Sequence, residues 1–152
     1  MDASLLKKVA LFEGLTQGQL AKVASIAQVR QYEGSSFIFR EGDTGQEMYV
    51  IVEGRVRISK NVPGIGEEAL AILEKGQYFG EMAVIDDNPR SADAIAHTPC
   101  TLWVIERTKL DQLMFTDKDL AYVLLWTFVR TLSERLRETG DKIKAFFAIS
   151  RF

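Results

Sequence analysis

Hydrophobic and polar residues repeat with two different periods along the chain. Between residues 29 and 106, short runs of β-branched and aromatic residues are separated by turns that contain glycine. Many short strands at regular spacing are typical of a sandwich, a jelly roll or a barrel. The runs are SFIF, EMYVIVE, RVRISK, EEALAIL, ADAIA and TLWVIE, and Glu53-Gly54 between two of them predicts a tight hairpin.

Residues 1–28 show helical spacing instead. Thr16 and Gln19 form a capping-box pattern, which predicts a helix that begins there and runs to about Ala27. Apolar residues between positions 5 and 10 indicate another short helix before it.

Residues 107–152 return to the helical pattern. Thr108 and Thr116 are each followed three residues later by aspartate, which predicts two helix starts. We expect the second helix to reach about Phe147, with Gly140 as a weak point.

The long helix carries two apolar stripes. Leu120, Leu124 and Phe128 form one stripe, which we expect to face the strands. The other follows a heptad seam, which predicts a parallel homodimer through this helix, unless the helix wraps entirely against its own core. The seam comprises Tyr122, Leu125, Val129, Leu132, Leu136, Thr139, Ile143 and Phe146.

These patterns together predict a single, mainly β domain with flanking helices. We expect a β-roll or jelly-roll barrel at residues 29–106, N-terminal helices at 1–28 and C-terminal helices at 107–152, the last of them long. The chain of 152 residues is 47% hydrophobic, which is enough for a core. A net charge of −2 argues against a surface made mainly for nucleic acid or an anionic membrane.

Cysteine usage and apolar runs bear on location. Cys100 is the one cysteine, so no intrachain disulfide forms. The first residues lack the apolar core of a signal peptide, and the longest apolar run, residues 120–129, is too short to cross a bilayer. We therefore expect a cytoplasmic protein that does not enter a membrane.

The segment FGEMAVIDDNPRSADA, residues 79–94, sets Glu81 and Arg90 among apolar residues. Buried charges are costly unless they are paired, so these two either pair with each other or bind a ligand. Arg90 suits a phosphate, Ser91 adds a hydroxyl donor, and Glu81 is an acceptor for a sugar hydroxyl.

The surrounding residues suit the same ligand. Backbone N–H groups at Glu81, Met82 and Ala83, after the turn at Gly80, can face an anion, and small Ala83 and Ala92 leave room. The predicted ligand is a compact molecule with one phosphate and a ribose hydroxyl.

This segment resembles the phosphate-binding cassette of cyclic nucleotide-binding domains, whose usual form is close to F-G-E-L-A-L-x(n)-P-R-S/T/A-A-T-V. The resemblance extends to the E-G-D-x-G turn at residues 41–45 and to M-Y-V-I-x-x-G at 48–54. It covers nearly the whole chain, and it implies a sensor of cAMP or cGMP rather than an enzyme.

The resemblance also implies a role for each matching residue. Glu81 would hold the ribose 2′-hydroxyl, and Arg90 would neutralise the cyclic phosphate with help from Ser91 and the turn at residues 80–83. Ile58 and Leu70 match apolar positions that line the base. RLRETGDKI, residues 135–143, resembles the segment that closes over adenine, which places Thr139 at the base edge and Arg135 close by.

Three departures from the family pattern matter. Asp93 stands where the family often has Thr, Ser or a bulky residue, and we expect its carboxylate to face outward. Gly140 replaces a polar base contact. The chain ends at Phe152, about where DNA-binding transcription activators that contain such a domain begin their helix-turn-helix, so we expect no direct DNA binding.

Two other classes of protein compete with this interpretation. A degenerate domain in which Glu81 and Arg90 hold each other would serve as an interaction or structural domain. The residues that a jelly-roll enzyme or metal protein needs are missing from this sequence. His97 is the one histidine, whereas a metal site of this architecture needs several, and Cys100 has no other histidine to activate it.

The resemblance of residues 135–143 to a cAMP receptor favours cAMP, while Ser91 is compatible with cGMP as well. We expect no catalytic residue, no metal and no cofactor other than this ligand. We expect a downstream protein partner, which the sequence does not identify, to bind the helical ends of the domain.

Overall fold

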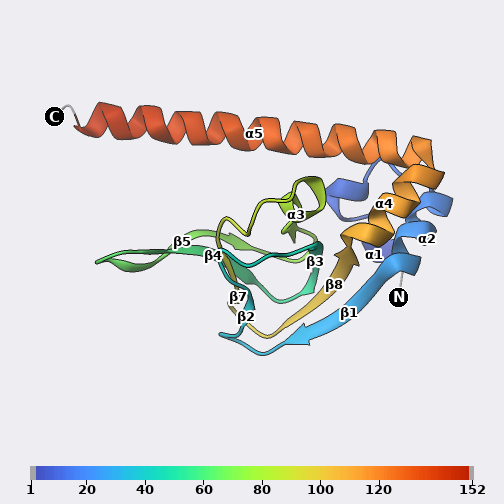
Figure 1. Cartoon of the computed structure of the whole chain (residues 1–152), viewed down its shortest axis with the longest axis horizontal. Helices are drawn as coiled ribbons and strands as arrows, with labels where there is room; N and C mark the ends of the chain where they lie inside the picture. The colour runs from blue at the N-terminus through green and yellow to red at the C-terminus, as the bar shows by residue number, and fades with distance from the viewer. Residues whose placement is uncertain (1–2, 151–152) are drawn as a thin grey trace.

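Two antiparallel sheets of four strands each form the centre of this computed structural model, which describes residues 3–150 (Figure 1). One sheet has the order β1-β8-β3-β6 and the other β2-β7-β4-β5. The strands are β1 (Ala27–Tyr32), β2 (Phe37–Phe39), β3 (Glu47–Glu53), β4 (Val56–Val62), β5 (Gly66–Leu73), β6 (Tyr78–Phe79), β7 (Asp93–Ala96) and β8 (Cys100–Glu106).

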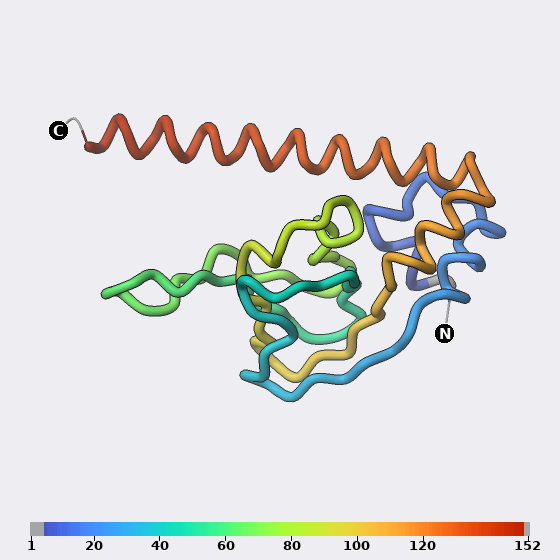
Figure 2. Tube along the Cα trace, in the orientation of Figure 1, coloured from blue at the N-terminus to red at the C-terminus, as the bar shows by residue number. Residues whose placement is uncertain are grey.

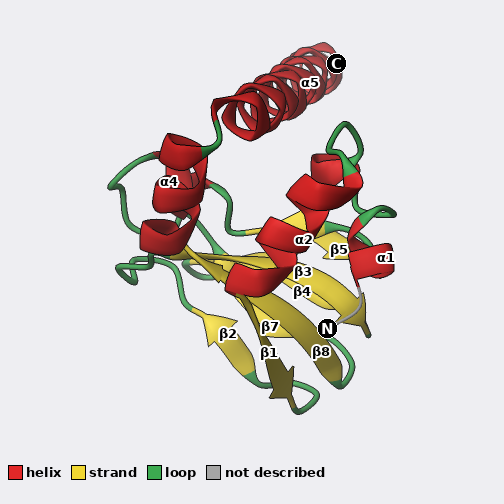
Figure 3. Ribbon diagram, turned by 90° about the vertical axis from the view of Figure 1, so that its right-hand side faces the viewer, coloured by secondary structure: helices red, strands yellow, loops and turns green. Residues whose placement is uncertain are grey.

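The helices lie outside the sheets (Figure 3), and all but α3, which stands between β6 and β7, come from the two ends of the sequence. They are α1 (Ala3–Leu6), the 3₁₀ turn η1 (Ala10–Phe12), α2 (Gln17–Ile26), α3 (Met82–Ile85), α4 (Arg107–Thr116) and α5 (Lys118–Ser150). Helix α5 begins beside the N-terminal helices and runs across the molecule to its far end (Figure 2). The predicted β-roll with N-terminal helices and a long C-terminal helix is confirmed.

The hydrophobic core has two parts. One lies between the sheets and contains Ile51, Leu102 and Val104, all at most 1% exposed. The other lies between the first sheet and the helices, where Trp103 and Ile105 of β8 meet Leu124 of α5. Because successive side chains of a strand point to opposite faces, β8 contributes to both parts.

Helix starts show where local sequence patterns hold. The capping box at Thr16 and Gln19 is confirmed, since each side chain accepts a hydrogen bond from the other residue's backbone N–H. The other two predicted starts are wrong by a residue or two. Helix α4 follows Glu106, and Asp117 rather than Thr116 caps α5, because its carboxylate accepts the N–H of Leu120 at 3.0 Å.

The two stripes of α5 have different environments. Leu120, Leu124 and Phe128 are buried against the core, as predicted. The heptad seam on the other side is exposed, with Val129 at 55% and Leu136 at 73%. Of the two stripes, only the first therefore packs against the domain.

The buried stripe gives a test of how α5 is attached. We expect Leu124→Ala to lower the free energy of unfolding by about 2–5 kcal/mol, because Leu124 is fully buried and its removal leaves a cavity. Urea denaturation followed by circular dichroism, without nucleotide, measures the change.

Leu70→Ala is the matched control. Leu70 is 54% exposed, so we expect a change within about 0.5 kcal/mol. Equal effects of the two substitutions would contradict the packing of α5 described above.

Candidate functional site

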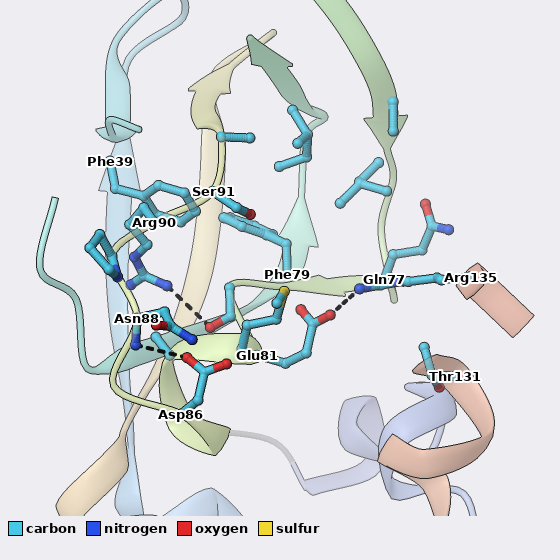
Figure 4. A pocket seen from close by; sticks show the side chains of 18 of the residues that line it. Phe39, Gln77, Phe79, Glu81, Asp86, Asn88, Arg90, Ser91, Thr131 and Arg135 are labelled. Atoms are coloured by element: carbon cyan, nitrogen blue, oxygen red, sulfur yellow. Dashed lines mark hydrogen bonds and ion pairs between the residues drawn. The ribbon is translucent and has the colours of Figure 1, made fainter. Parts of the chain in front are cut away.

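A cavity of about 490 Å³ opens between the segment after β6, the second sheet and α5 (Figure 4). Its volume is in the range of small-ligand sites. The lining residues are Phe39, Ile58, Ala71, Leu73, Gln77, Phe79, Gly80, Glu81, Met82, Ala83, Asp86, Asn88, Pro89, Arg90, Ser91, Ala92, Thr131, Glu134, Arg135 and Glu138.

Arg90 is held by both its backbone and its side chain. Its backbone N–H donates to Asp43 O at 2.8 Å, and its carbonyl accepts the N–H of Gly42 at 2.9 Å. Its Nη1 donates to Gly80 O at 3.1 Å and its Nη2 to Glu47 O at 2.9 Å. The turn at residues 41–45 therefore fixes the backbone of Arg90, and the carbonyls of Gly80 and Glu47 fix its guanidinium.

Two glycines make room for this side chain. A Cβ on Gly45 would lie 2.3 Å from Arg90 Nε, and a Cβ on Gly80 would lie 3.0 Å from Arg90 Nη1. Gly80 also has a φ of +74°, a conformation that favours glycine. The last glycine of the E-G-D-x-G turn and the cassette glycine are thus explained by the space that Arg90 needs.

The guanidinium of Arg90 lies in an apolar environment. It stands 4.1 Å from the ring centroid of Phe39, and the residue is 8% exposed. Burial lowers the pKa of Arg90 from its ordinary value, but an arginine remains charged at neutral pH. Its Nε has no hydrogen-bond partner among the described residues. No carboxylate side chain of residues 5–150 forms an ion pair with this cation.

Glu81 is paired with a different arginine. Its side chain is 4% exposed and accepts a hydrogen bond from Arg135 Nη1 of α5. Figure 4 shows Glu81 directed toward Arg135, and Arg90 directed toward Phe39. The mutual ion pair of Glu81 and Arg90, expected for a degenerate domain, is therefore not present in the structure.

Glu47 supports the site from behind. Its carboxylate accepts two hydrogen bonds from Arg30, at 2.7 and 3.0 Å, and one from Tyr49 Oη at 2.9 Å. The hydrogen bonds from Arg30 hold the pKa of Glu47 below its ordinary value. The backbone carbonyl of Glu47 accepts a hydrogen bond from Arg90, while its carboxylate is bound to Arg30 and Tyr49. The guanidinium of Arg90 therefore contacts a neutral carbonyl of Glu47 and not its charged side chain.

Most of the sequence-predicted site residues meet at this cavity. They are Ile58, Gly80, Glu81, Met82, Ala83, Arg90, Ser91, Ala92 and Arg135. Of the three backbone N–H groups predicted to face the anion, that of Ala83 already donates a hydrogen bond to Gly80 O at 3.2 Å.

Leu70 and Thr139 do not line the cavity, contrary to the sequence-based expectation. Ile58 pairs with Ala71 and Ser59 with Ala69, so Leu70 is the extra residue of a β-bulge. The bulge leaves Ala71 and Leu73 at the cavity in its place. The hydroxyl of Thr139 donates to Arg135 O on its own helix, and Glu138 reaches the cavity instead.

Sequence reasoning also missed Phe39 and Glu47. Phe39 belongs to the run SFIF, and strand alternation alone does not predict that its ring lies beside Arg90. Glu47 follows the E-G-D-x-G turn closely, and no sequence signal shows that its carbonyl binds Arg90.

Asp93 and Arg107 shape the cassette from outside. The carboxylate of Asp93 accepts the N–H of Glu41 at 2.7 Å, so it stabilises the turn and does not line the cavity. Arg107 Nη1 donates to Asp86 O at 3.0 Å and to the Asp87 carboxylate at 2.6 Å. Arg107 thereby joins the start of α4 to the segment that follows α3.

Within residues 3–150, no three His, Cys, Asp or Glu side chains gather where a metal ion would bind. Burial raises the pKa of the Cys100 thiol, which makes a poor nucleophile. None of the helices there has the length and apolar character that a membrane span requires.

Comparisons with known proteins identify the family of this chain. Residues 29–117 match the family model described as the cyclic nucleotide-binding domain. The cGMP-dependent protein kinase egl-4 of Caenorhabditis briggsae is 33% identical over 114 residues, which are 74% of this chain and 15% of that kinase. The chain therefore spans a small part of this relative.

Solved structures show the same fold. The catabolite activator protein of Thermus thermophilus has a TM-score of 0.81 at 31% identity, over 90% of this chain and 62% of that one. The regulatory domain of Toxoplasma gondii PKA, solved with cAMP, has a TM-score of 0.74 at 29% identity, over 90% of this chain and 48% of that one. This chain belongs to the cyclic nucleotide-binding domain family.

Proposed function

We propose that this chain is a sensor of a purine cyclic nucleotide and prefers cAMP to cGMP. It would bind the nucleotide without catalysis and signal through α5. The observation that carries the proposal is the separation of Glu81 and Arg90. Both are buried at one cavity, and neither is paired with the other. A cyclic nucleotide offers a phosphate to Arg90 and a ribose hydroxyl to Glu81.

The proposed binding mode uses side chains that already line the cavity. Arg90 faces the phosphate with a cation that lacks a carboxylate partner, and Ser91 adds a hydroxyl beside it. Ile58, Ala71 and Leu73 offer an apolar wall to the flat base. Because Arg90 is held by the backbone before the ligand arrives, little ordering of this side chain accompanies binding.

The choice of base rests on fewer contacts. The likeness to a regulatory domain solved with cAMP favours adenine. cGMP is the second candidate, because Ser91 and the carboxylate of Glu138 both line the cavity. A carboxylate accepts hydrogen bonds from the N–H groups on the edge of guanine.

The link to α5 is the ion pair between Glu81 and Arg135. A ribose hydroxyl that donates to Glu81 changes the partner of Arg135, which is the contact between the cassette and the long helix. Ligand binding therefore favours one position of α5 over another, as in other population shifts. Couplings of this kind are typically about 1–3 kcal/mol.

We also propose that α5 pairs with α5 of a second copy. Its exposed seam includes Leu125, Val129 and Leu136, which are 53%, 55% and 73% exposed. Residues spaced by three and four along a helix form the seam of a parallel coiled coil. The location in the cytoplasm, the unknown downstream protein and the absence of direct DNA binding stay predictions.

Arg90 provides the test of nucleotide binding. We expect Arg90→Ala to weaken cAMP binding roughly 30- to several-thousand-fold, because truncating one partner of a buried charged contact costs about 2–5 kcal/mol. Isothermal titration calorimetry with cAMP and with cGMP, on both proteins, measures the loss and identifies the preferred base.

Arg55→Ala is the matched control, since Arg55 is an exposed arginine outside the cavity lining. Its affinity should equal that of the wild type. Thermal melting shows whether Arg90→Ala remains folded, and Arg90→Lys retains the charge with less disturbance. A folded Arg90→Ala protein with unchanged affinity contradicts the site, and failure of the wild type to bind either nucleotide contradicts the function.

Helix pairing provides a separate test. In sedimentation equilibrium we expect the wild type to form dimers, and Val129→Glu to weaken them by at least tenfold, because the substitution places two carboxylates in the seam. We expect cAMP to change the dimer affinity, by about 5- to 150-fold if the coupling is typical. Arg135→Ala should reduce that change.

Ala148→Glu is the control for added charge, because position 148 is exposed and lies off the seam. It should leave the dimer affinity unchanged. A wild-type protein that stays monomeric at all concentrations, with and without cAMP, would exclude the homodimer.

A further inference from the structure

A second cavity, of about 320 Å³, lies under the N-terminal helical segment and shares no lining residue with the first. Its residues come from three parts of the chain. They are Leu5, Lys8 and Val9, then Val50, Ile51 and Val52 of β3, then Lys75 and Gly76 of the next turn, and Trp103 of β8.

The interior of this cavity is apolar. Val9, Val50 and Trp103 are 2%, 1% and 3% exposed, so its walls belong to the core. None of its lining residues carries a carboxylate or a hydroxyl. An apolar cavity of this kind holds water poorly and favours an apolar occupant.

Two lysines set the charge of the same cavity. Lys8 and Lys75 are both exposed, and neither forms an ion pair with a carboxylate of residues 5–150. An ammonium at the end of a flexible stem contacts an anion as a point charge. The pair thus complements a molecule that joins an apolar body to an anionic head.

We infer that this cavity binds a short-chain organic anion, such as a short fatty carboxylate. Its volume lies at the small end of the range for ligand sites, which suits a short chain rather than a whole lipid. The chain would contact Trp103 and Val50, and the carboxylate would lie between the ammonium groups of Lys8 and Lys75. Each buried methylene contributes about 0.8 kcal/mol.

The position of this cavity connects it to the first. Gly76 lines the second cavity and Gln77, the next residue, lines the first. Both are held to one residue of β3, because Gly76 N donates to Ile51 O and Ile51 N donates to Gln77 O, each at 2.9 Å. The chain then continues through β6 to Glu81.

An anion that moves this turn therefore acts on the nucleotide site, and linkage makes the effect reciprocal. This coupling rests on the proposed function, whereas binding of the anion does not.

Trp103 reports the binding step. The chain has two tryptophans, so Trp126→Phe leaves Trp103 as the one fluorophore of this kind. We expect octanoate, below its micelle concentration, to change the fluorescence of this variant saturably. Octanol and octylammonium, which share the apolar body, should bind at least tenfold more weakly because they lack the anionic head.

Variants in the same background separate charge from shape. Lys8→Met with Lys75→Met should weaken octanoate at least tenfold, and Val52→Phe should block it by filling the cavity. Lys142→Met removes an exposed lysine of α5 and should change nothing. No saturable response to octanoate overturns the site, and so does equal binding of octanoate and octylammonium, or unchanged binding in the double lysine variant.

Calorimetric titration of cAMP with and without saturating octanoate tests the coupling. We expect at least a fivefold change in cAMP affinity. Unchanged affinity overturns the coupling. If cAMP does not bind at all, the proposed function fails, while the response of Trp103 to octanoate still decides whether the second site exists.

Discussion

The burial of one cation, Arg90, is the constraint on which the arrangement of the site depends. A guanidinium removed from water needs acceptors, and here they are the backbone carbonyls of Gly80 and Glu47. Those carbonyls belong to the cassette and to the start of β3, so the arginine ties the two together. Gly45 must lack a side chain to admit it. The cation is thus fixed in place without being neutralised, as an anion site requires.

Glu81 shows the opposite arrangement. Its carboxylate is buried, but its partner Arg135 is 46% exposed and belongs to a helix that is otherwise attached elsewhere. An ion pair with one exposed member is weak, whereas a buried carboxylate left without a partner is costly. In the proposed binding mode, a ribose hydroxyl that replaces Arg135 removes that cost. The site would then combine a fixed cation with an anion whose partner changes on binding.

The sequence predicted the parts of the site that are local. The cassette residues from Gly80 to Ala92 are close in the chain, and a short connection keeps them together in space. Leu70 was misplaced because a β-bulge shifts the alternation of β5, and no residue type in EEALAIL marks the bulge. Thr139 was misplaced because the rotation of α5 depends on how Leu120, Leu124 and Phe128 pack. Glu47 was missed because it holds Arg90 through its backbone carbonyl, a group that every residue has and that no residue type therefore reveals.

The long helix is attached at one end. Its buried residues, Leu120, Leu124 and Phe128, all lie in its first third, and every residue from 136 to 150 is exposed. Arg135 stands at the boundary between the attached and the unattached part. An isolated helix of only a few turns is marginal in water, so pairing with a second copy, as proposed above, would stabilise the exposed part. In the proposed function, a change of contact at Arg135 would turn a small shift near the cassette into a larger displacement at the helix end.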